Sequence, residues 1–402
     1  MNDVTFAINA PMPRKDPYGA LSMPVYHCCA YEFPDHKAMI ASFTGVSDDP
    51  DYSRVTNPTV IHFENIIKSL TGARDVVAFT SGMAAITAAT MALTGAGRKI
   101  VTSRHLFGNT YLLFTSTLKR FGVETELVDL TDIDAVRAAV DDNTAMLYLE
   151  TVSNPQMEIC DIRKLSEIAH SKGAAVVADT TMIPFVFADM KSLGVDVEIL
   201  SSTKYLSGGA TSLGGVVIDY GTIKDFDYRL RKDMLMNLGG YMSPHAAYMQ
   251  TLGLETLRAR YAVHEDNARK VAEGLESIIA DMEKEGEVRK GEMSVCWPGL
   301  ASNPYHELAK RQFGGHYSAM LTLTLPDEES CFRFIDRLKT IRRATNLFDN
   351  RTLAIHPAST IFGTIDAETR ASMDVSDRLI RLSIGLEDSD DLLEDLSQAL
   401  GN

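Results

Sequence analysis

The sequence has no apolar run long enough to cross a bilayer, and its first residues lack the basic and apolar regions of a signal peptide. Basic residues are outnumbered, because 39 Lys and Arg face 54 Asp and Glu, giving a net charge of −15 that disfavours binding to nucleic acid. The ten histidines show no metal-ligand spacing. The cysteines are few and scattered, as expected for packing residues in a reducing compartment: Cys28, Cys29, Cys160, Cys296 and Cys331. We therefore expect a soluble cytoplasmic protein with no metal site and no membrane or nucleic-acid partner.

Apolar residues make up 45% of the 402 positions, which is enough for two cooperating domains with substantial cores. Short apolar runs alternate with helical stretches such as 110–121, 131–140 and 161–172. This alternation predicts an α/β fold with a mainly parallel seven-stranded sheet and helices on both faces. The expected strands are 76–80, 99–103, 124–130, 144–150, 174–179, 197–201 and 214–219.

Three regions are expected along the chain. Residues 1–50 contain several prolines and should form an extended arm suited to wrapping a partner. Residues 51–250 should contain the sheet, and residues 251–402 a smaller C-terminal α+β domain. In the smaller domain we expect a long helix from about Leu254 to Ile279, strands 318–325 and 379–386, and helices 328–340 and Asp391 to Leu400.

Lys204 follows the apolar run 195–200 within Ser-Ser-Thr-Lys-Tyr and precedes two glycines. A lysine at the end of a buried strand, with hydroxyl groups before it, could hold an aldehyde cofactor as a Schiff base. A solvated lysine that closes the strand is the alternative interpretation. The residues at neighbouring strand ends therefore decide between the two.

Two such strand ends carry suitable groups. Asp179 ends the run 174–179 and could keep a cofactor ring nitrogen protonated, although an aspartate that caps a turn is also compatible. Ser81 opens an alanine-rich helix after a short strand. This helix start could bind a phosphate, or it could be an ordinary capped strand–helix unit with no ligand. Arg381 lies in an alternating strand among apolar residues, so its buried charge requires an anion from a ligand or from an acidic side chain.

These segments together resemble the Cys/Met-metabolism family of pyridoxal-phosphate enzymes, which act in trans-sulfuration and methionine biosynthesis. The resemblance covers nearly the whole chain. Its most specific motifs are residues 52–59, 81–85, 150–155, 179–181, 201–204 and 381–388. It implies the aminotransferase-like fold type I, with pyridoxal 5'-phosphate bound by the domain 51–250.

The resemblance also implies roles for individual residues. Lys204 would carry the Schiff base and move protons, Asp179 would pair with the pyridine nitrogen, and Phe107 would stack on the ring. The implied cofactor contacts are Tyr52, Arg54, Ser81, Gly82, Met83, Phe107, Asn154, Asp179, Thr181, Ser201, Thr203 and Lys204. The implied substrate contacts are Arg381, which would grip the α-carboxylate, Asn346 and Tyr52.

Tyr52 and Arg54 carry an implication about assembly. In the family that the chain resembles, the matching pair reaches the phosphate of a neighbouring subunit. We therefore expect a homo-oligomer, a tetramer built from dimers that share active sites, although an ordinary surface arginine is the alternative for Arg54. The small-molecule substrate would be an amino acid, and some relatives take sulfur from a small carrier protein instead of from free sulfide.

Two departures from the family pattern narrow the expected activity. Phe107 stands where most members have a tyrosine, so it keeps a stacking surface and loses the phenol. The segment 344–360, with Asn346 and Arg351, resembles O-acetylhomoserine sulfhydrylases, except that Phe348 replaces their usual glycine. Arg351 could attract an anionic donor or be a solvated charge.

The expected reaction is therefore conversion of O-acetylhomoserine and sulfide to homocysteine and acetate. A methionine or cystathionine γ-lyase that releases 2-oxobutanoate and ammonia is the alternative enzyme. Outside enzymes, the alternatives are a cofactor-binding protein with little turnover of its own and an α/β domain whose lysine holds no cofactor.

Overall fold

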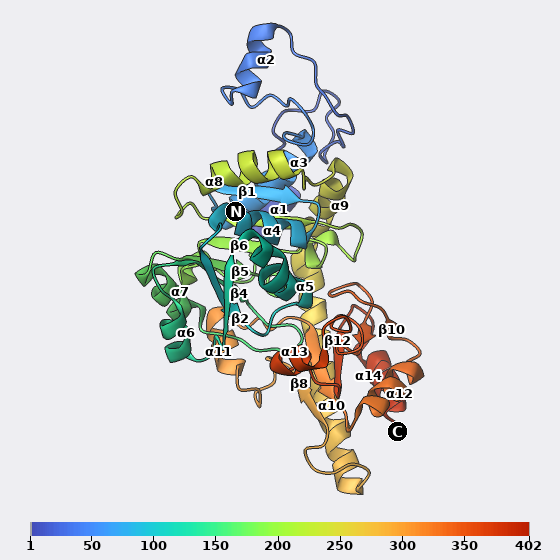
Figure 1. The fold of residues 1–402 in the computed structure, drawn as a ribbon. Coiled ribbons are helices and arrows are strands. Elements are labelled where there is room, and N and C mark those ends of the chain that lie inside the picture. Colours follow the sequence, from blue (N-terminus) through green and yellow to red (C-terminus); the bar gives the residue numbers. More distant parts are fainter. Residues whose placement is uncertain (1, 402) are drawn as a thin grey trace.

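The computed structural model describes residues 2–401 and contains two sheets joined by a long helix (Figure 1). The larger sheet has seven strands in the order β1-β7-β6-β5-β4-β2-β3. Only β7 runs antiparallel to its neighbours, so the fold class expected from the sequence is confirmed. Every strand lies within two residues of its expected bounds: β1 (Asp75–Phe79), β2 (Lys99–Ser103), β3 (Glu124–Val128), β4 (Thr144–Glu150), β5 (Ala175–Asp179), β6 (Val197–Leu200) and β7 (Gly215–Asp219).

The strands of this sheet are buried on both faces. In β5, Val176 and Ala178 belong to one apolar cluster, while Ala175 and Val177 belong to a second cluster on the other face. Continuous apolar runs are typical of parallel strands that are covered by helices on both sides. These runs explain why the strands could be located from the sequence.

Helices surround the larger sheet and follow most of its strands. Many begin with a capping side chain, as Asn57, Ser81 and Asp161 each accept a hydrogen bond from a first-turn amide. The helices of this region are α3 (Pro58–Thr71), α4 (Gly82–Leu93), α5 (Gly108–Leu112), α6 (Ile133–Ala139), α7 (Ile162–Ser171), α8 (Phe226–Tyr228) and α9 (Pro244–Glu255).

The helix expected over 110–121 is not a single α-helix. α5 ends at Leu112, a wider π-helical turn covers Leu113–Thr117, and a tight 3₁₀ turn covers Leu118–Phe121. The buried side chains of Leu113, Phe114 and Leu118 all pack into the same apolar cluster. Tertiary packing therefore changes the helical period within one continuous segment.

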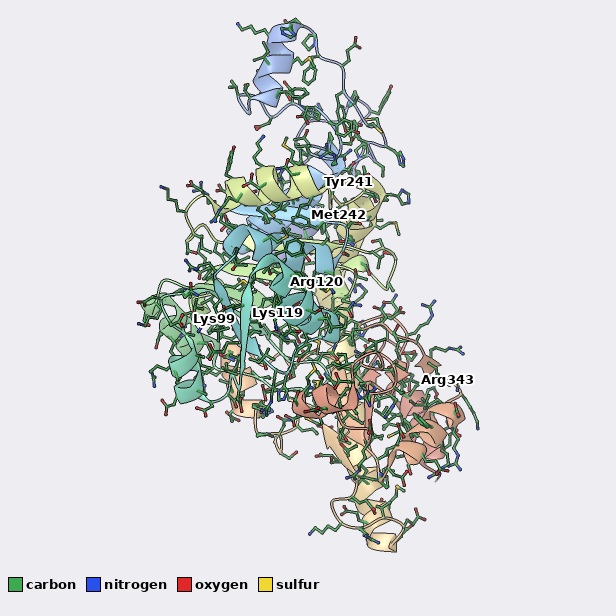
Figure 2. All side chains as sticks on the ribbon, in the orientation of Figure 1. Lys99, Lys119, Arg120, Tyr241, Met242 and Arg343 are labelled. Carbon is green, nitrogen blue, oxygen red and sulfur yellow. The ribbon has the colours of Figure 1, made fainter. Side chains whose placement is uncertain are left out.

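The second sheet has five strands in the order β10-β11-β12-β9-β8. Its elements are β8 (Ser294–Cys296), β9 (Met320–Thr324), β10 (Arg342–Arg343), β11 (Leu353–Ile355), β12 (Leu379–Ser383), α11 (His306–Gln312), α12 (Glu328–Arg337), α13 (Ala367–Ser372) and α14 (Ser389–Leu400). The helix α10 (Leu257–Glu285) leads into this sheet, and Figure 1 shows it running from the larger sheet past the C-terminal elements. Figure 2 shows Arg343 on this C-terminal part of the molecule.

The N-terminal arm is not extended throughout, contrary to the expectation from its prolines. Two helices interrupt it, α1 (Asp3–Ile8) and α2 (His36–Phe43), and their capping residues Asn2 and Asp35 accept first-turn amides. α1 packs on α3 and α9, whereas α2 lies well away from the body of the molecule (Figure 1). Figure 2 shows Tyr241 and Met242 on the side of the body that faces this arm.

No helix within residues 2–401 combines the length and the apolar composition that a membrane span requires.

Candidate active site

Most of the residues expected to hold a cofactor, but not Tyr52 and Arg54, come from segments at one edge of the larger sheet. β4, β5 and β6 are parallel, so Glu150 and Asp179 lie side by side where β4 and β5 end, and Ser201 directly follows the end of β6. β7 runs the opposite way, and its first residue, Gly215, therefore lies beside Phe79 at the end of β1. Ligands of open α/β sheets bind at this carboxyl edge.

Lys204 immediately precedes a short 3₁₀ turn (Tyr205–Ser207) after β6, and it is partly buried. Its Nζ donates a hydrogen bond of 2.7 Å to Oδ1 of Asn346, which lies in the loop before β11. Burial and the nearby Arg381 guanidinium lower the pKa of the Lys204 amine to about 8. A substantial fraction of this amine is therefore neutral near pH 7–8 and able to act as a nucleophile or base.

Asp179 has a partly buried carboxyl at the end of β5. Its Oδ1 accepts the backbone N–H of Thr181 at 2.9 Å, and its Oδ2 accepts the hydroxyl of Tyr148 at 3.2 Å. Burial raises the pKa of Asp179, although the hydrogen bonds from Thr181 oppose that effect. A cation placed beside this carboxyl would stabilise its charged form, so it suits a pyridinium nitrogen.

A candidate anion site lies between the start of α4 and the loop after β6. Ser81 caps α4, since its Oγ accepts the N–H of Ala84 at 3.1 Å, and the N–H groups of Gly82 and Met83 have no partner within the helix. A side chain at position 82 would lie only 2.8 Å from Cβ of Ser201. Glycine therefore lets the helix start approach the segment after β6.

The other hydroxyl groups of this edge connect the loops to one another. Thr181 Oγ1 accepts the N–H of Ser201 at 2.9 Å. The Thr203 hydroxyl donates to the carbonyl of Gly214 at 3.1 Å and accepts the N–H of Gly214 at 3.0 Å. These bonds fix the segment that carries Lys204 against both neighbouring strands.

Arg381, on β12, brings a charge from the second sheet to the same place. Its guanidinium is 4% exposed and donates to Oδ1 of Asn154 at 3.1 Å and to the backbone carbonyl of Asn346 at 3.2 Å. Its Nε is buried without a hydrogen-bond partner, and no carboxylate of residues 2–401 forms an ion pair with it. Burial lowers the pKa of Arg381 to about 9. An incoming anion would therefore satisfy both the charge and the unpaired N–H.

Tyr52 and Arg54 make no hydrogen bond to these residues within residues 2–401. Arg54 donates to the backbone carbonyl of Met236 and lies over the Tyr52 ring, 5.5 Å from its centroid. Tyr52 is 45% exposed, and both residues line a hollow of about 820 Å³ beneath the N-terminal arm.

Glu150 is a site residue to which the sequence analysis assigned no role, although it begins one of the quoted motifs. Its Oε1 accepts the backbone N–H of Phe107 at 2.8 Å, and it pairs in register with Asp179 on the adjacent strand. Burial and the neighbouring Asp179 raise the pKa of Glu150 well above its usual range. A carboxylate at the end of a buried strand was the available signal, because the same signal had identified Asp179.

Within the segment 344–360, Phe348 and Arg351 have different settings. Phe348 is fully buried, stacks on Tyr205 with ring centroids 3.8 Å apart, and has a φ of 55°, which glycine adopts more easily. Arg351 is exposed on the surface and pairs with Asp349 at 3.2 Å.

A lysine with a lowered pKa, a partly buried carboxyl and a helix start with free amides fit the three chemical parts of pyridoxal 5'-phosphate. The fold and this group of residues define a pyridoxal-phosphate-dependent enzyme of fold type I. A sequence model of the family described as Cys/Met metabolism PLP-dependent enzyme matches residues 4–401. The chain therefore belongs to this family, and pyridoxal phosphate is its cofactor.

Known proteins with several different activities are similar to the chain. An O-succinylhomoserine sulfhydrylase of Pseudomonas aeruginosa is 37% identical, over 98% of this chain and 94% of that protein. A cystathionine γ-lyase of Bacillus subtilis is 32% identical over the full length of both. A Campylobacter jejuni protein assigned as an O-acetylhomoserine (thiol)-lyase is 31% identical over both full chains, with a TM-score of 0.92, and its crystal structure carries N'-pyridoxyl-lysine-5'-monophosphate.

Proposed function

We propose that this enzyme catalyses γ-substitution on an O-acylated homoserine, with sulfide as the nucleophile and homocysteine as the product. O-acetylhomoserine is the proposed ester, so acetate is the leaving group. The observation that carries the proposal is the buried Arg381, which lacks a carboxylate partner within residues 2–401 and lies close enough to affect the Lys204 amine. This arrangement suits a substrate with an α-carboxylate next to an α-amino group.

Pyridoxal phosphate, when bound, supplies an electron sink that stabilises negative charge on substrate carbon atoms. Around it we assign Asp179 to the ring nitrogen, Asn154 to the phenolic oxygen and Phe107 to the ring face. Thr181 would support the ring from the end of its strand. We assign the phosphate to Ser81, Gly82, Met83, Ser201 and Thr203, with Tyr52 and Arg54 of a neighbouring subunit.

Lys204 is the proposed proton carrier of the reaction. Its amine, with a pKa of about 8, would take the proton from substrate Cα and then one from Cβ, after which the γ-substituent leaves. Sulfide adds at Cγ, and Lys204 returns the protons to Cβ and Cα. Asn346 accepts a hydrogen bond from the Lys204 amine and so holds it toward the space beside Arg381.

The identity of residue 107 supports an ester substrate. A thiolate leaves poorly unless an acid protonates it, whereas a carboxylate such as acetate leaves without that help. Phe107 has no acidic group to offer. Arg351 is relevant to the choice of acyl group. A succinyl ester ends in a carboxylate that a free arginine could attract, but the ion pair with Asp349 partly neutralises the Arg351 charge. Phe107 thus supports an O-acyl ester of either kind, and the Asp349 pairing supports acetyl over succinyl.

A γ-lyase is the second candidate, because the Bacillus subtilis relative is named a cystathionine γ-lyase. The discriminating assay gives purified holoenzyme O-acetyl-, O-succinyl- or O-phosphohomoserine, with and without sulfide, and measures homocysteine against 2-oxobutanoate. We expect homocysteine to dominate when sulfide is present. Faster consumption of cystathionine than of O-acetylhomoserine would contradict the proposal, and Lys204→Ala is the control for background reaction.

We also propose that active sites are shared between subunits. Large apolar side chains of the arm are exposed in one chain, including Tyr18 at 95% and Leu21 at 99%, which supports a partner subunit at this surface. Lys204→Ala and Arg54→Ala subunits, each inactive alone, should then recover activity when mixed by reversible dissociation. Random pairing makes about half of the dimers hybrids. Each hybrid has one complete site out of two, so the mixture should show about a quarter of wild-type activity. No recovery in hybrids shown to form would argue that Arg54 serves its own subunit.

A further inference from the structure

Glu150 and Asp179 form a pair of partly buried carboxyl groups on adjacent strands. They are register partners at the ends of β4 and β5, so their side chains lie on the same face of the sheet. No Lys, Arg or His of residues 2–401 forms an ion pair with Glu150. The other titratable group facing the pair is the buried hydroxyl of Tyr148, which donates to Asp179.

Each carboxyl group of the pair has hydrogen-bond donors. Asp179 accepts from the Tyr148 hydroxyl and the Thr181 amide, one donor on each oxygen. Glu150 accepts the N–H of Phe107 on Oε1, and the backbone N–H of Asn154 also stabilises its charged form. Two adjacent, partly buried carboxylates repel each other, so the pair is most stable with one negative charge. Asp179, with a cationic ring nitrogen proposed beside it, is the member that should hold this charge.

The bond to Phe107 ties Glu150 to the ring-stacking position. Phe107 immediately precedes α5, and no side-chain cap holds that end of the helix. Gly108 packs closely against the backbone at Ile361, where an added side chain would lie 3.3 Å from the carbonyl oxygen. The backbone at 107–108 is thus fixed on one side by Glu150 and on the other by the segment after β11.

We infer that Glu150 is a positioning residue whose neutral carboxyl fixes the backbone of Phe107, and thereby the stacking ring, while Asp179 keeps the negative charge for the pyridinium. The inference rests on the proposed placement of Phe107 and Asp179 around the cofactor. It assigns Glu150 no contact with substrate. Its proton stays on the carboxyl throughout turnover.

The test uses Glu150→Gln, which keeps an acceptor oxygen without a charge, and Glu150→Leu, which removes the acceptor. Glu198→Gln is the matched control, because Glu198 is fully buried in the same sheet but bonds to Thr180 and Tyr220 on the other face. The first readout is hydrogen–deuterium exchange at the Phe107 amide of the apoprotein. The second is the dissociation constant of pyridoxal phosphate, measured by absorbance.

With Glu150→Gln and Glu198→Gln, we expect amide protection and cofactor affinity to stay within about threefold of wild type. With Glu150→Leu, we expect the Phe107 amide to exchange about tenfold faster and the cofactor to bind about tenfold more weakly, the effect of one lost hydrogen bond. Equal losses in Glu150→Gln and Glu150→Leu would show that the charge is needed and overturn the inference. Unchanged protection in Glu150→Leu would overturn the positioning role.

A third readout remains informative if the leucine variant does not fold. Folding raises the pKa of the Glu150 carboxyl. Such a group makes the folded protein less stable as pH rises above the pKa that the carboxyl has in the unfolded chain. Apoprotein carrying Glu150→Gln should therefore melt above wild type at pH 8, with the difference disappearing toward pH 4. A glutamine variant that melts below wild type at pH 8 would mean that Glu150 is ionised. None of these readouts measures turnover, so failure of the proposed reaction would leave them unaffected.

Discussion

Replacing Arg381 with methionine should weaken catalysis while strengthening the fold. The buried guanidinium has hydrogen bonds to Asn154 and Asn346, an unpaired Nε and no ion pair within residues 2–401. Two charge-assisted hydrogen bonds to a substrate carboxylate contribute about 1.5–3 kcal/mol each. Their loss should lower kcat/KM by a factor of about 10² to 10⁴, since about 1.4 kcal/mol corresponds to tenfold.

The same change should stabilise the apoprotein. Replacement of a poorly compensated buried charge by an apolar side chain of similar volume is often stabilising by about 1–4 kcal/mol. Burial lowers the pKa of Arg381 to about 9, so the penalty is present below that pH and is relieved as pH rises through it. Thermal melting of apo Arg381→Met should exceed wild type at pH 7, and the gain should shrink above about pH 9.

Arg378 provides a matched control three residues earlier in the chain. Its guanidinium donates to the backbone carbonyls of Leu325 and Glu292, at 2.8 and 2.6 Å, and so has a structural role. Arg378→Met should lower the melting temperature and leave kcat/KM within a fewfold of wild type. If Arg381→Met instead destabilised the protein and retained kcat/KM, Arg381 would be a structural arginine and the assigned carboxylate site would be wrong.

Four further outcomes are expected. Apoprotein should combine with pyridoxal phosphate at a rate that rises with pH and levels off above about pH 8, as followed by absorbance, because only neutral Lys204 attacks the aldehyde. Phe107→Tyr should raise turnover of cystathionine relative to O-acetylhomoserine in a 2-oxobutanoate assay, because it restores an acidic phenol. Phe348→Gly should lower the free energy of unfolding by about 2–4 kcal/mol, because lost burial and stacking outweigh the relief of a positive φ. Burial lowers the pKa of His105, but hydrogen bonds to Glu158 and Asp374 outweigh it and raise that pKa overall. The melting temperature of wild type should therefore fall as pH rises above about 6.5, and His105→Gln should not show this fall.

The strands and the strand-end chemistry were determined by local sequence. Buried parallel strands read as continuous apolar runs, so the carboxyl edge that carries Asp179 and Lys204 could be located from the order of residues alone. The buried charge of Arg381 was predictable for a related reason, because one arginine interrupts an apolar alternation. Local patterns of this kind need no knowledge of distant residues.

The tertiary structure alone decided which groups meet and how they are charged. Glu158 and Asp374 both hydrogen-bond to His105, and Asn346 accepts a hydrogen bond from Lys204. These partners are far apart in the sequence, so no local pattern could predict that they meet. The pKa values of Glu150 and Lys204 depend on the water excluded by the assembled fold and on neighbours from other strands. Desolvation and proximity are properties of the packed chain, so the sequence could supply the chemical groups but not their protonation or their partners.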